Sequence, residues 1–386
     1  MRVENANKLY KQLIKSSDIT RLTILKPVIS DNGFSVLLQE YINDNNNSFN
    51  LTVEGAEINE DLILIIIASL VLQKYKKIDI DFSVKYEVLE EMKYITGATI
   101  KSKGVLFESI QRPEQKNWSL NLSGGIDSIT LKLLCPELIP IALLFTDLSP
   151  DQQVSEQNLK DFDITTIKTN AFEFLFARYS TGFYNLGSLM LANEKNIKYA
   201  INGKIMTDDY LRLYNKTVEQ FPDIYGIKVL YPLLGFTKIG IYKLLYKLNK
   251  KTLDTINKRY HQKVKLKAAK LKHMICENMT NTKIDSISKD VQVSFDECPF
   301  YGVYLVKKGF FQDIPDELKE SINDIDISFY SKYDKKYLEY LPEDFRNYFE
   351  KKLIDAGVEF YSDEDYAERD KVIAICMQFV KFEITG

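Results

Sequence analysis

The sequence predicts an α/β protein in which a doubly wound parallel sheet follows a smaller α+β domain and precedes a mainly helical region. Three observations lead to this prediction. In the middle of the chain, apolar strand patterns alternate with helical patterns, as is typical of a parallel sheet covered by helices. Short β patterns precede this section, and a lysine-rich and then tyrosine-rich section follows it. We therefore expect parts at residues 1–105, 106–250 and 251–386.

The first part mixes short strand patterns with helical stretches. The predicted strands, rich in β-branched and aromatic residues, are Thr20–Leu25, Phe34–Leu38 and Phe49–Val53. Helices are expected near 60–75 and 84–95, and turns at Asp31–Gly33 and Asn43–Ser48. This part carries no motif that points to chemistry, so a structural or substrate-recognition role is the default expectation.

The middle part repeats strand and helix in order. The predicted elements are a strand at Leu138–Phe145, a helix around 151–160, a strand at Asp163–Lys168, a helix at Tyr184–Asn193 and a strand at Lys198–Gly203. Ligands of such sheets lie beyond the carboxyl ends of the strands. We therefore expect the residues that follow these strands to converge on one site, including Phe145, Thr146, Asp147 and Gly203.

The segment Leu120–Leu131 is the most informative stretch of the chain. It has the pattern of a strand end, a two-glycine turn and a helix that begins at Ile126 or Asp127. The first N–H groups of a helix lack intrahelical partners and lie at the positive end of its dipole. This arrangement therefore predicts an anion site, for which a phosphate is the natural ligand.

The residue types in this turn suit a metal-bound nucleotide. Gly124 and Gly125 allow the backbone to approach a ligand closely, and the hydroxyls of Ser123 and Ser128 can donate to phosphate oxygens. The carboxylate of Asp127 would repel a bare phosphate. A bridging Mg²⁺ removes this conflict, so the turn predicts a magnesium–nucleotide complex.

Residues 123–128, with the sequence Ser-Gly-Gly-Ile-Asp-Ser, resemble the SGGxDS signature of the PP-loop ATP pyrophosphatase superfamily. The resemblance covers about residues 115–245. It implies an adenine nucleotide alpha hydrolase-like fold, with ATP and Mg²⁺ as cofactors and Ile126 among the ATP-binding residues. It also implies attack of a substrate oxygen on the α-phosphate, loss of pyrophosphate, and displacement of AMP by a nitrogen or sulfur nucleophile. The other common phosphate loop, GxxxxGK[ST], does not occur in the chain.

The stretch after Gly203 resembles the position where members of this superfamily carry a glycine turn and an acidic metal ligand. The resemblance implies that Asp208 or Asp209 supplies a second carboxylate for Mg²⁺, opposite Asp127. It also implies that Lys204 lies near the phosphates. A surface turn with solvated charges is the alternative interpretation. Gly203 is the better supported residue, because it follows an apolar strand that faces the predicted cleft.

A later element, Leu230–Tyr242, is similar to the "PL…K" element that follows the last core strand in many PP-loop enzymes. We expect Pro232 to end the strand, Thr237 to cap the next helix and Lys238 to lie in its first turn. A cation at this end of a helix opposes the dipole, so Lys238 indicates an anionic partner such as a phosphate or a substrate carboxylate. A lysine that extends into solvent is the alternative.

The last part changes in charge along the chain. Residues 247–272 contain ten Lys or Arg, which predicts a basic amphipathic helix. Binding of RNA there is not favoured, because the whole chain has a net charge of -3. Residues 311–370 are acidic, and we expect their tyrosines to be packing residues, for example Tyr330, Tyr333, Tyr337 and Tyr340. The opposite charges predict that the two regions face each other, within one subunit or across a homodimer.

Cysteine, histidine and apolar patterns exclude several classes of site. Only two histidines occur, at His261 and His273, so neither a histidine base nor a histidine metal site is expected. The four cysteines are scattered and predict no zinc site but a reducing compartment, the cytoplasm: Cys135, Cys276, Cys298 and Cys376. The longest apolar run, Leu62–Leu72, is shorter than the roughly 20 residues that span a bilayer, so we expect a buried helix and no membrane segment.

Within the superfamily, the layout is closest to 7-cyano-7-deazaguanine synthase-like proteins. The loop lies near the start of the catalytic part, and Glu297–Phe300 holds one cysteine where such proteins carry a zinc site of four cysteines. Members without the zinc site and with an added amino-terminal domain are associated with bacterial anti-phage operons. The resemblance implies a ligase that adenylates a carboxylate-like oxygen, with a deazapurine as one candidate, and couples it to ammonia or an amine.

Asp127, Lys238 and Lys204 are the expected catalytic residues, because charge grows on the departing pyrophosphate and must be neutralised. No glutaminase domain is visible in the sequence, so ammonia would be free or supplied by a partner protein. Two alternatives stay open. One is a tRNA-modifying enzyme that directs sulfur or an amine to an activated base, and the other is a non-catalytic nucleotide-binding subunit.

Overall fold

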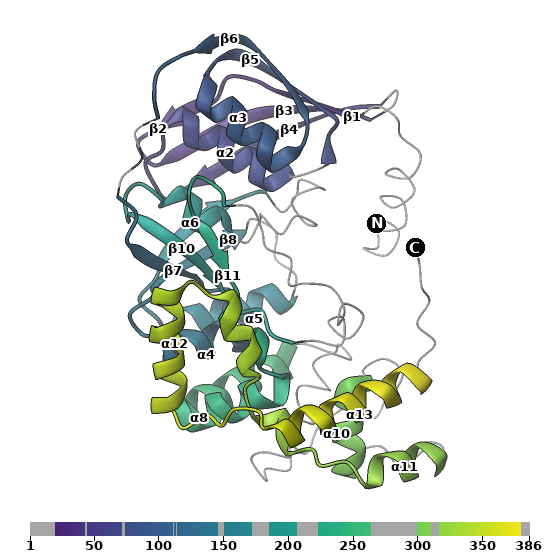
Figure 1. The fold of residues 1–386 in the computed structure, drawn as a ribbon. Helices are drawn as coiled ribbons and strands as arrows, with labels where there is room; N and C mark the ends of the chain where they lie inside the picture. The colour runs from purple at the N-terminus through teal and green to yellow at the C-terminus, as the bar shows by residue number, and fades with distance from the viewer. Residues whose placement is uncertain are drawn as a thin grey trace.

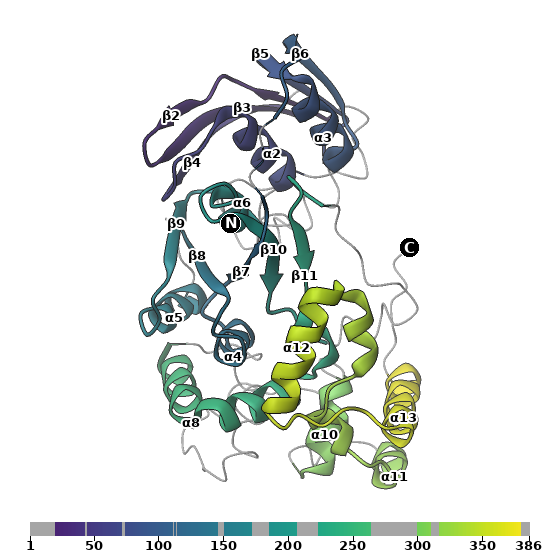
Figure 2. The same ribbon diagram turned by 60° about the vertical axis from the view of Figure 1, so that its left-hand side comes forward.

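The computed structural model describes residues 20–42, 45–71, 74–110, 112, 114–145, 150–171, 185–206, 223–263, 299–309 and 316–379. Within these ranges the strands form one mixed eleven-stranded sheet that runs through the first two parts of the chain. Figures 1 and 2 show that the amino-terminal strands lie at one end of the molecule and the carboxyl-terminal helices at the other. The predicted α/β class is therefore confirmed.

The amino-terminal part consists of six strands and two helices among its described residues. The strands are β1 (Thr20–Ile24), β2 (Val28–Ser30), β3 (Gly33–Ile42), β4 (Asn45–Glu54), β5 (Lys77–Lys85) and β6 (Thr99–Leu106), and the helices are α2 (Glu60–Val71) and α3 (Tyr86–Thr96). β1 pairs with β3 antiparallel and with β5 parallel. β5 alternates polar and apolar residues, which buries Ile78, Ile80 and Val84 against the helices.

The predicted elements of this part are present, with one correction. The polar run predicted as a turn at Asn43–Ser48 belongs largely to β4, which begins at Asn45 and pairs with β3 along its whole length. The strand pairing extends to Asn45 because the backbone of β3 lies opposite these asparagines. A side-chain contact adds to the pairing, since Asn47 donates from Nδ2 to Glu40 Oε2 at 3.4 Å. Pairing with a neighbouring strand thus overrides the low β propensity of asparagine. β2, β5 and β6 lie outside the strands predicted above.

The middle part contributes five parallel strands. They are β7 (Asn117–Asn121), β8 (Ile139–Phe145), β9 (Thr165–Thr169), β10 (Ile197–Asn202) and β11 (Lys228–Leu230). Their order in the sheet is β11-β10-β7-β8-β9, so the direction of winding reverses between β7 and β10. This is the strand order of a doubly wound sheet, in which ligands bind at the point of reversal.

Helices cover both faces of these strands. On one face lie α4 (Ile126–Leu134), α5 (Pro150–Leu159) and α8 (Lys238–Lys263), and on the other lies α6 (Leu186–Met190). Successive strand residues point to opposite faces, so Leu120 and Ala142 pack in the core with α4, whereas Ile141 and Ile167 pack in the core with α6. The predicted alternation of strand and helix is confirmed for the described residues.

β4 and β9 join the two groups of strands into one sheet. They pair antiparallel, with Val53 opposite Thr169 and Glu54 opposite Lys168. Asn170 extends the junction, because its Oδ1 accepts from Thr52 N at 2.8 Å and its Nδ2 donates to Asn50 O at 2.8 Å. The hydrophobic core of the amino-terminal part continues from α2 onto α6, so the two parts are connected by packing as well as by the sheet.

The carboxyl-terminal part is mainly helical in its described residues, as predicted. Its elements are α10 (Pro299–Lys307), α11 (Asp316–Asn323), the 3₁₀ helices η6 (Ser328–Ser331) and η7 (Lys335–Tyr340), α12 (Glu343–Asp355) and α13 (Asp363–Phe379). Tyr330 and Tyr333 are completely buried, which confirms their predicted packing role, while Tyr340 is 41% exposed. Asp334 accepts from Arg369 Nη1 at 2.7 Å and from the hydroxyl of Tyr366 at 2.6 Å.

Residues 247–263 of the predicted basic helix are described and belong to α8, while residues 264–272 lie outside the described ranges. In the described portion, Arg259 donates to Asp161 Oδ2 at 2.9 Å and to Asn158 Oδ1 at 3.0 Å, so its contact is with the end of α5. Lys247 donates to the carbonyl of Gly357 at 3.3 Å. None of the helices in the described ranges combines the length and the apolar character needed to cross a membrane.

We predict that Asn170→Ala lowers the free energy of unfolding by about 1–3 kcal/mol, because it leaves two backbone groups at the β4–β9 junction without their partners. Urea unfolding of the full chain measures the effect. Asn50→Ala is the matched control, since Asn50 contributes only its backbone carbonyl to this contact. Equal stability of the two variants would contradict the assigned role of the Asn170 side chain.

Candidate functional site

The two-glycine turn has the predicted form of strand, turn and helix. β7 ends at Asn121, and α4 begins at Ile126. Gly124 has φ +76, and a Cβ on it would lie 2.0 Å from the carbonyl oxygen of Ser155 on α5, so only glycine fits. Gly125 is the N-cap residue, and no side chain caps the helix. The first N–H groups of α4 therefore present the conditions for anion binding.

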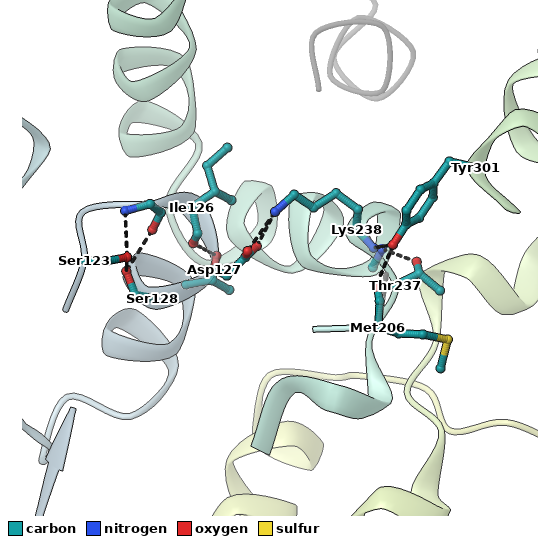
Figure 3. A network of polar contacts seen from close by, with 11 residues as sticks. Ser123, Ile126, Asp127, Ser128, Met206, Thr237, Lys238 and Tyr301 are labelled. Atoms are coloured by element: carbon teal, nitrogen blue, oxygen red, sulfur yellow. Dashed lines mark hydrogen bonds and ion pairs between the residues drawn. The ribbon is translucent and has the colours of Figure 1, made fainter. Parts of the chain in front are cut away.

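The hydroxyls of the turn meet on one side of it (Figure 3). Ser123 Oγ lies 3.1 Å from Ser128 Oγ, and Ser128 Oγ also donates to the carbonyl of Gly125 at 3.0 Å. Behind the turn, Asn158 on α5 donates from Nδ2 to the carbonyl of Gly124 at 3.0 Å. These contacts fix the backbone of the turn from α5 while the hydroxyls remain able to rotate towards a ligand.

Asp127 and Lys238 form an ion pair across the site. Lys238 Nζ lies 2.6 Å from Asp127 Oδ1 and 2.8 Å from Oδ2 (Figure 3). The side chain of Lys238 is only 15% exposed and that of Asp127 only 25%. Lys238 is the first residue of α8, and Thr237 Oγ1 accepts from Gly240 N at 3.2 Å. The predicted cap and first-turn lysine are thus confirmed. The anion that Lys238 contacts in this structure is the carboxylate of Asp127.

The turn after β10 packs directly on α4. A Cβ on Gly203 would lie 2.8 Å from Ser128 N and 2.9 Å from Ser128 Cα, so the absence of a side chain permits this approach. The predicted convergence of this turn with the phosphate loop is therefore confirmed. Lys204, the next residue, places its ammonium 5.5 Å from the ring centroid of Tyr231, which follows β11.

Several predicted site residues fall outside the described ranges. They are Thr146, Asp147, Asp208 and Asp209. Phe145 is described, and it ends β8 as a partly buried residue on the α6 side of the sheet. The structure thus brings together the loop, Gly203 and Lys238, and it places Phe145 at the carboxyl end of the neighbouring strand.

Tyr301 is a site residue that sequence reasoning missed. Its hydroxyl accepts from the backbone N–H of Lys238 at 3.0 Å and donates to the carbonyl of Met206 at 2.6 Å (Figure 3). Met206 in turn donates from its N–H to the carbonyl of Phe236 at 3.0 Å. Tyr301 thereby joins α10 to the start of α8 and to the segment after β10. The one signal in the sequence is that Tyr301 directly follows Glu297–Phe300, the segment singled out above for its single cysteine.

The described acidic, histidine and cysteine residues form no cluster of three or more that could hold a metal ion on its own. Mg²⁺ does not require one, because it is commonly bound by one or two carboxylates together with substrate phosphates and water. The carboxylate of Asp127, in the first turn of α4, fits this pattern. Cys135 is buried, and burial raises the pKa of its thiol to about 12, so it is not a nucleophile at neutral pH.

Comparison of the chain with protein-family models, curated proteins and solved structures found no match. A function therefore has to be proposed from the geometry of the site. It unites an uncapped helix start, two hydroxyls, a carboxylate and an ammonium at the point where the sheet reverses its winding.

We predict that Gly124→Ala lowers the free energy of unfolding by more than about 1 kcal/mol, because its φ of +76 strains a residue with a Cβ and the Cβ meets Ser155. Thermal or urea unfolding measures the loss. Gly125→Ala is the control, since the Cβ there lies 3.4 Å from Ser123 Oγ and φ is -77. A greater loss for Gly125→Ala would refute the assigned roles.

We also predict that Tyr301→Phe lowers the free energy of unfolding by about 1–3 kcal/mol, because Lys238 N–H and the carbonyl of Met206 lose their partner. Tyr304→Phe, on the same helix, is the matched control, and its ring packs on Tyr330. Urea unfolding of both variants provides the comparison. No difference between them would show that the Tyr301 hydroxyl contributes nothing beyond its ring.

Proposed function

We propose that the chain is an ATP-dependent ligase that forms AMP and pyrophosphate, adenylating a carboxylate-like oxygen and coupling it to ammonia or an amine. The observation that carries the proposal is the uncapped start of α4, which follows a left-handed glycine and carries Asp127 in its first turn. A turn that served packing alone would not need a carboxylate and two hydroxyls around it. The SGGxDS pattern of the turn, which resembles that of PP-loop enzymes, supports the same conclusion.

In this proposal, each residue of the turn has a separate role in binding the triphosphate. The N–H groups at the start of α4 and the hydroxyls of Ser123 and Ser128 bind phosphate oxygens. Asp127 would hold Mg²⁺ together with those oxygens, and the bound ion would neutralise part of the charge that grows on departing pyrophosphate. Asp208 or Asp209 is proposed as the second carboxylate, and Ile126, Phe145, Thr146 and Gly203 complete the nucleotide site.

Lys238 changes partner in this proposal. Its ammonium occupies both oxygens of Asp127, at 2.6 and 2.8 Å, which are the same oxygens that a metal ion would need. Two cations compete for one carboxylate, so nucleotide binding directs Lys238 from Asp127 to a phosphate oxygen. Its backbone N–H stays bonded to the hydroxyl of Tyr301, and only the side chain moves. Lys204 is proposed as a further cation for the leaving pyrophosphate.

The acceptor must present an oxygen that attacks without losing an O–H proton, because the proposal assigns no general base. A carboxylate meets this condition, and a deazapurine carboxylate is one candidate. The layout without a four-cysteine element resembles that of proteins associated with bacterial anti-phage systems, and we propose that setting for this chain. Ammonia would be free or would come from a partner protein.

One observation favours a second function, the modification of tRNA. Lys250, Lys251 and Lys258 are exposed on the segment of α8 that follows its break at Asn249, and Lys238 begins the segment before that break. Such a row can bind RNA phosphates, and binding would then weaken steeply with added salt. Lack of RNA retention at low salt would exclude this function. A third candidate, a nucleotide-binding subunit without turnover, would bind ATP and Mg²⁺ but form no AMP with any acceptor.

We predict that Asp127→Asn reduces AMP formation roughly 100- to 1,000-fold, as the loss of one charge-stabilising group does in other sites. The ion pair is mostly buried, and the variant leaves the Lys238 ammonium beside a neutral amide, so the free energy of unfolding should fall by about 1–3 kcal/mol, which leaves the protein folded. Mass spectrometry of AMP and amide, with ATP, Mg²⁺, ammonia and deazaguanine carboxylates, measures turnover.

Asp61→Asn is the control for this experiment. Asp61 also pairs with a lysine, Lys85 at 2.8 Å, and the pair is similarly buried, but Asp61 lies in the first turn of α2 in the amino-terminal part. This variant should keep full activity. If Asp127→Asn unfolds the protein as much as it inactivates it, the catalytic assignment is wrong.

A further inference from the structure

A row of hydrogen-bonded asparagines crosses the sheet where its winding reverses. Ser188 Oγ donates to Asn121 Oδ1 at 3.2 Å, and Asn121 Nδ2 donates to Asn202 Oδ1 at 2.8 Å. Asn202 Nδ2 then donates to Asn185 Oδ1 at 3.2 Å. Each of the three amides thus accepts a hydrogen bond on its oxygen, and Asn121 and Asn202 also donate one from their nitrogen. Ser188, on α6, itself accepts from Ser119 Oγ on β7 at 2.9 Å, and the row ends at Asn185, immediately before α6.

The last donor of the row has no partner among the residues that the structure describes. Asn185 is 3% exposed, and its Nδ2 is buried without a hydrogen bond. The side chain does not cap α6 either. A buried amide donor without an acceptor is costly, and nearly all such groups in native proteins have a partner. The unmatched Nδ2 therefore points to an acceptor from outside the described protein.

The row lies beside the phosphate turn but on the other face of the sheet. Asn121 is the last residue of β7, two positions before Ser123, and Asn202 is the last residue of β10, directly before Gly203. The turn leads into α4, whereas the row contacts α6. A ligand whose phosphates lie on the turn would thus extend a different, non-phosphate group towards Asn185.

The chemistry of the row identifies that group. The residues at its core are asparagines and a serine, all of them uncharged, and burying a carboxylate or phosphate without a counter-charge would be unfavourable. A carbonyl or hydroxyl oxygen needs only a donor. Because the row is a chain of hydrogen bonds, each member polarises the next, which strengthens the last donor and fixes its direction.

We propose that the row Asn121–Asn202–Asn185 is a ligand subsite in which Nδ2 of Asn185 donates to a neutral oxygen. The subsite rests on the proposed function, which supplies two sources of that oxygen: a ribose hydroxyl of the nucleotide or a carbonyl of the acceptor. In either case Asn185 selects for an oxygen acceptor at a fixed distance from the phosphate turn.

Asn185→Asp tests the proposal in the full chain. An aspartate at this position still accepts from Asn202 Nδ2 but has no N–H to donate. Asn193→Asp is the matched control, because Asn193 Oδ1 accepts from the hydroxyl of Tyr225 and has no place in the row. Calorimetric titrations use ATP, 2′-deoxyATP, 3′-deoxyATP and pyrophosphate, all with Mg²⁺, and then guanine, uracil and nicotinamide.

If the oxygen belongs to the ribose, Asn185→Asp weakens ATP binding about tenfold and abolishes the preference for ATP over one of the deoxy forms, while pyrophosphate binding is unchanged. If it belongs to the acceptor, ATP binding is unchanged and binding of at least one base falls about tenfold. The proposal is overturned if the variant binds ATP and every base as the wild type does, or if the wild type binds no base and ATP binding is unchanged.

A second measurement covers the case in which Asn185→Asp does not fold. The side-chain amide signal of Asn185 in ¹⁵N-labelled wild-type protein, assigned by its loss in Asn185→Ala, should shift when ATP or a base is added. The absence of any shift overturns the subsite. If the wild type binds neither ATP nor pyrophosphate, the proposed function is overturned instead. The titrations with bases would still decide the subsite.

Discussion

The ion pair between Asp127 and Lys238 is the contact that brings the charged groups of the candidate site together. It joins the first turn of α4 to the first turn of α8, two elements that are 111 residues apart in the sequence. The backbone of Lys238 is fixed by Tyr301, and that of the turn is fixed by Asn158. The charged groups are therefore placed by rigid elements on both sides, which limits the rearrangement that ligand binding requires.

The amino-terminal part has a defined structural relation to this site. Its strands continue the sheet through β4 and β9, and α2 packs on α6. α6 carries Ser188, and Asn185 directly precedes it. One face of the sheet is thus supported by the first part of the chain, and the other face by α8 and the carboxyl-terminal helices. A substitution in either flanking part can therefore alter the site through a change in packing, without a direct contact to it.

The features that could be predicted from the sequence are local ones. The turn at Ser123–Ser128, the cap at Thr237 and the first-turn position of Lys238 all follow from residues within one turn or one strand. Tyr301 and Asn185 could not be found in this way, because their partners lie 63 and 17 residues away, respectively. The strand at Asn45–Ser48 was missed for a related reason, since its partner strand, and not its own composition, makes it extend.

The hydroxyl of Tyr301 has a consequence for the order in which the protein matures. During synthesis the two-glycine turn leaves the ribosome well before α10 does, and domains fold as their segments emerge. Until residue 301 is made, the N–H of Lys238 and the carbonyl of Met206 lack the partner that aligns them. A nascent chain can thus form its central sheet early and yet orient Lys238 correctly only after α10 has been made.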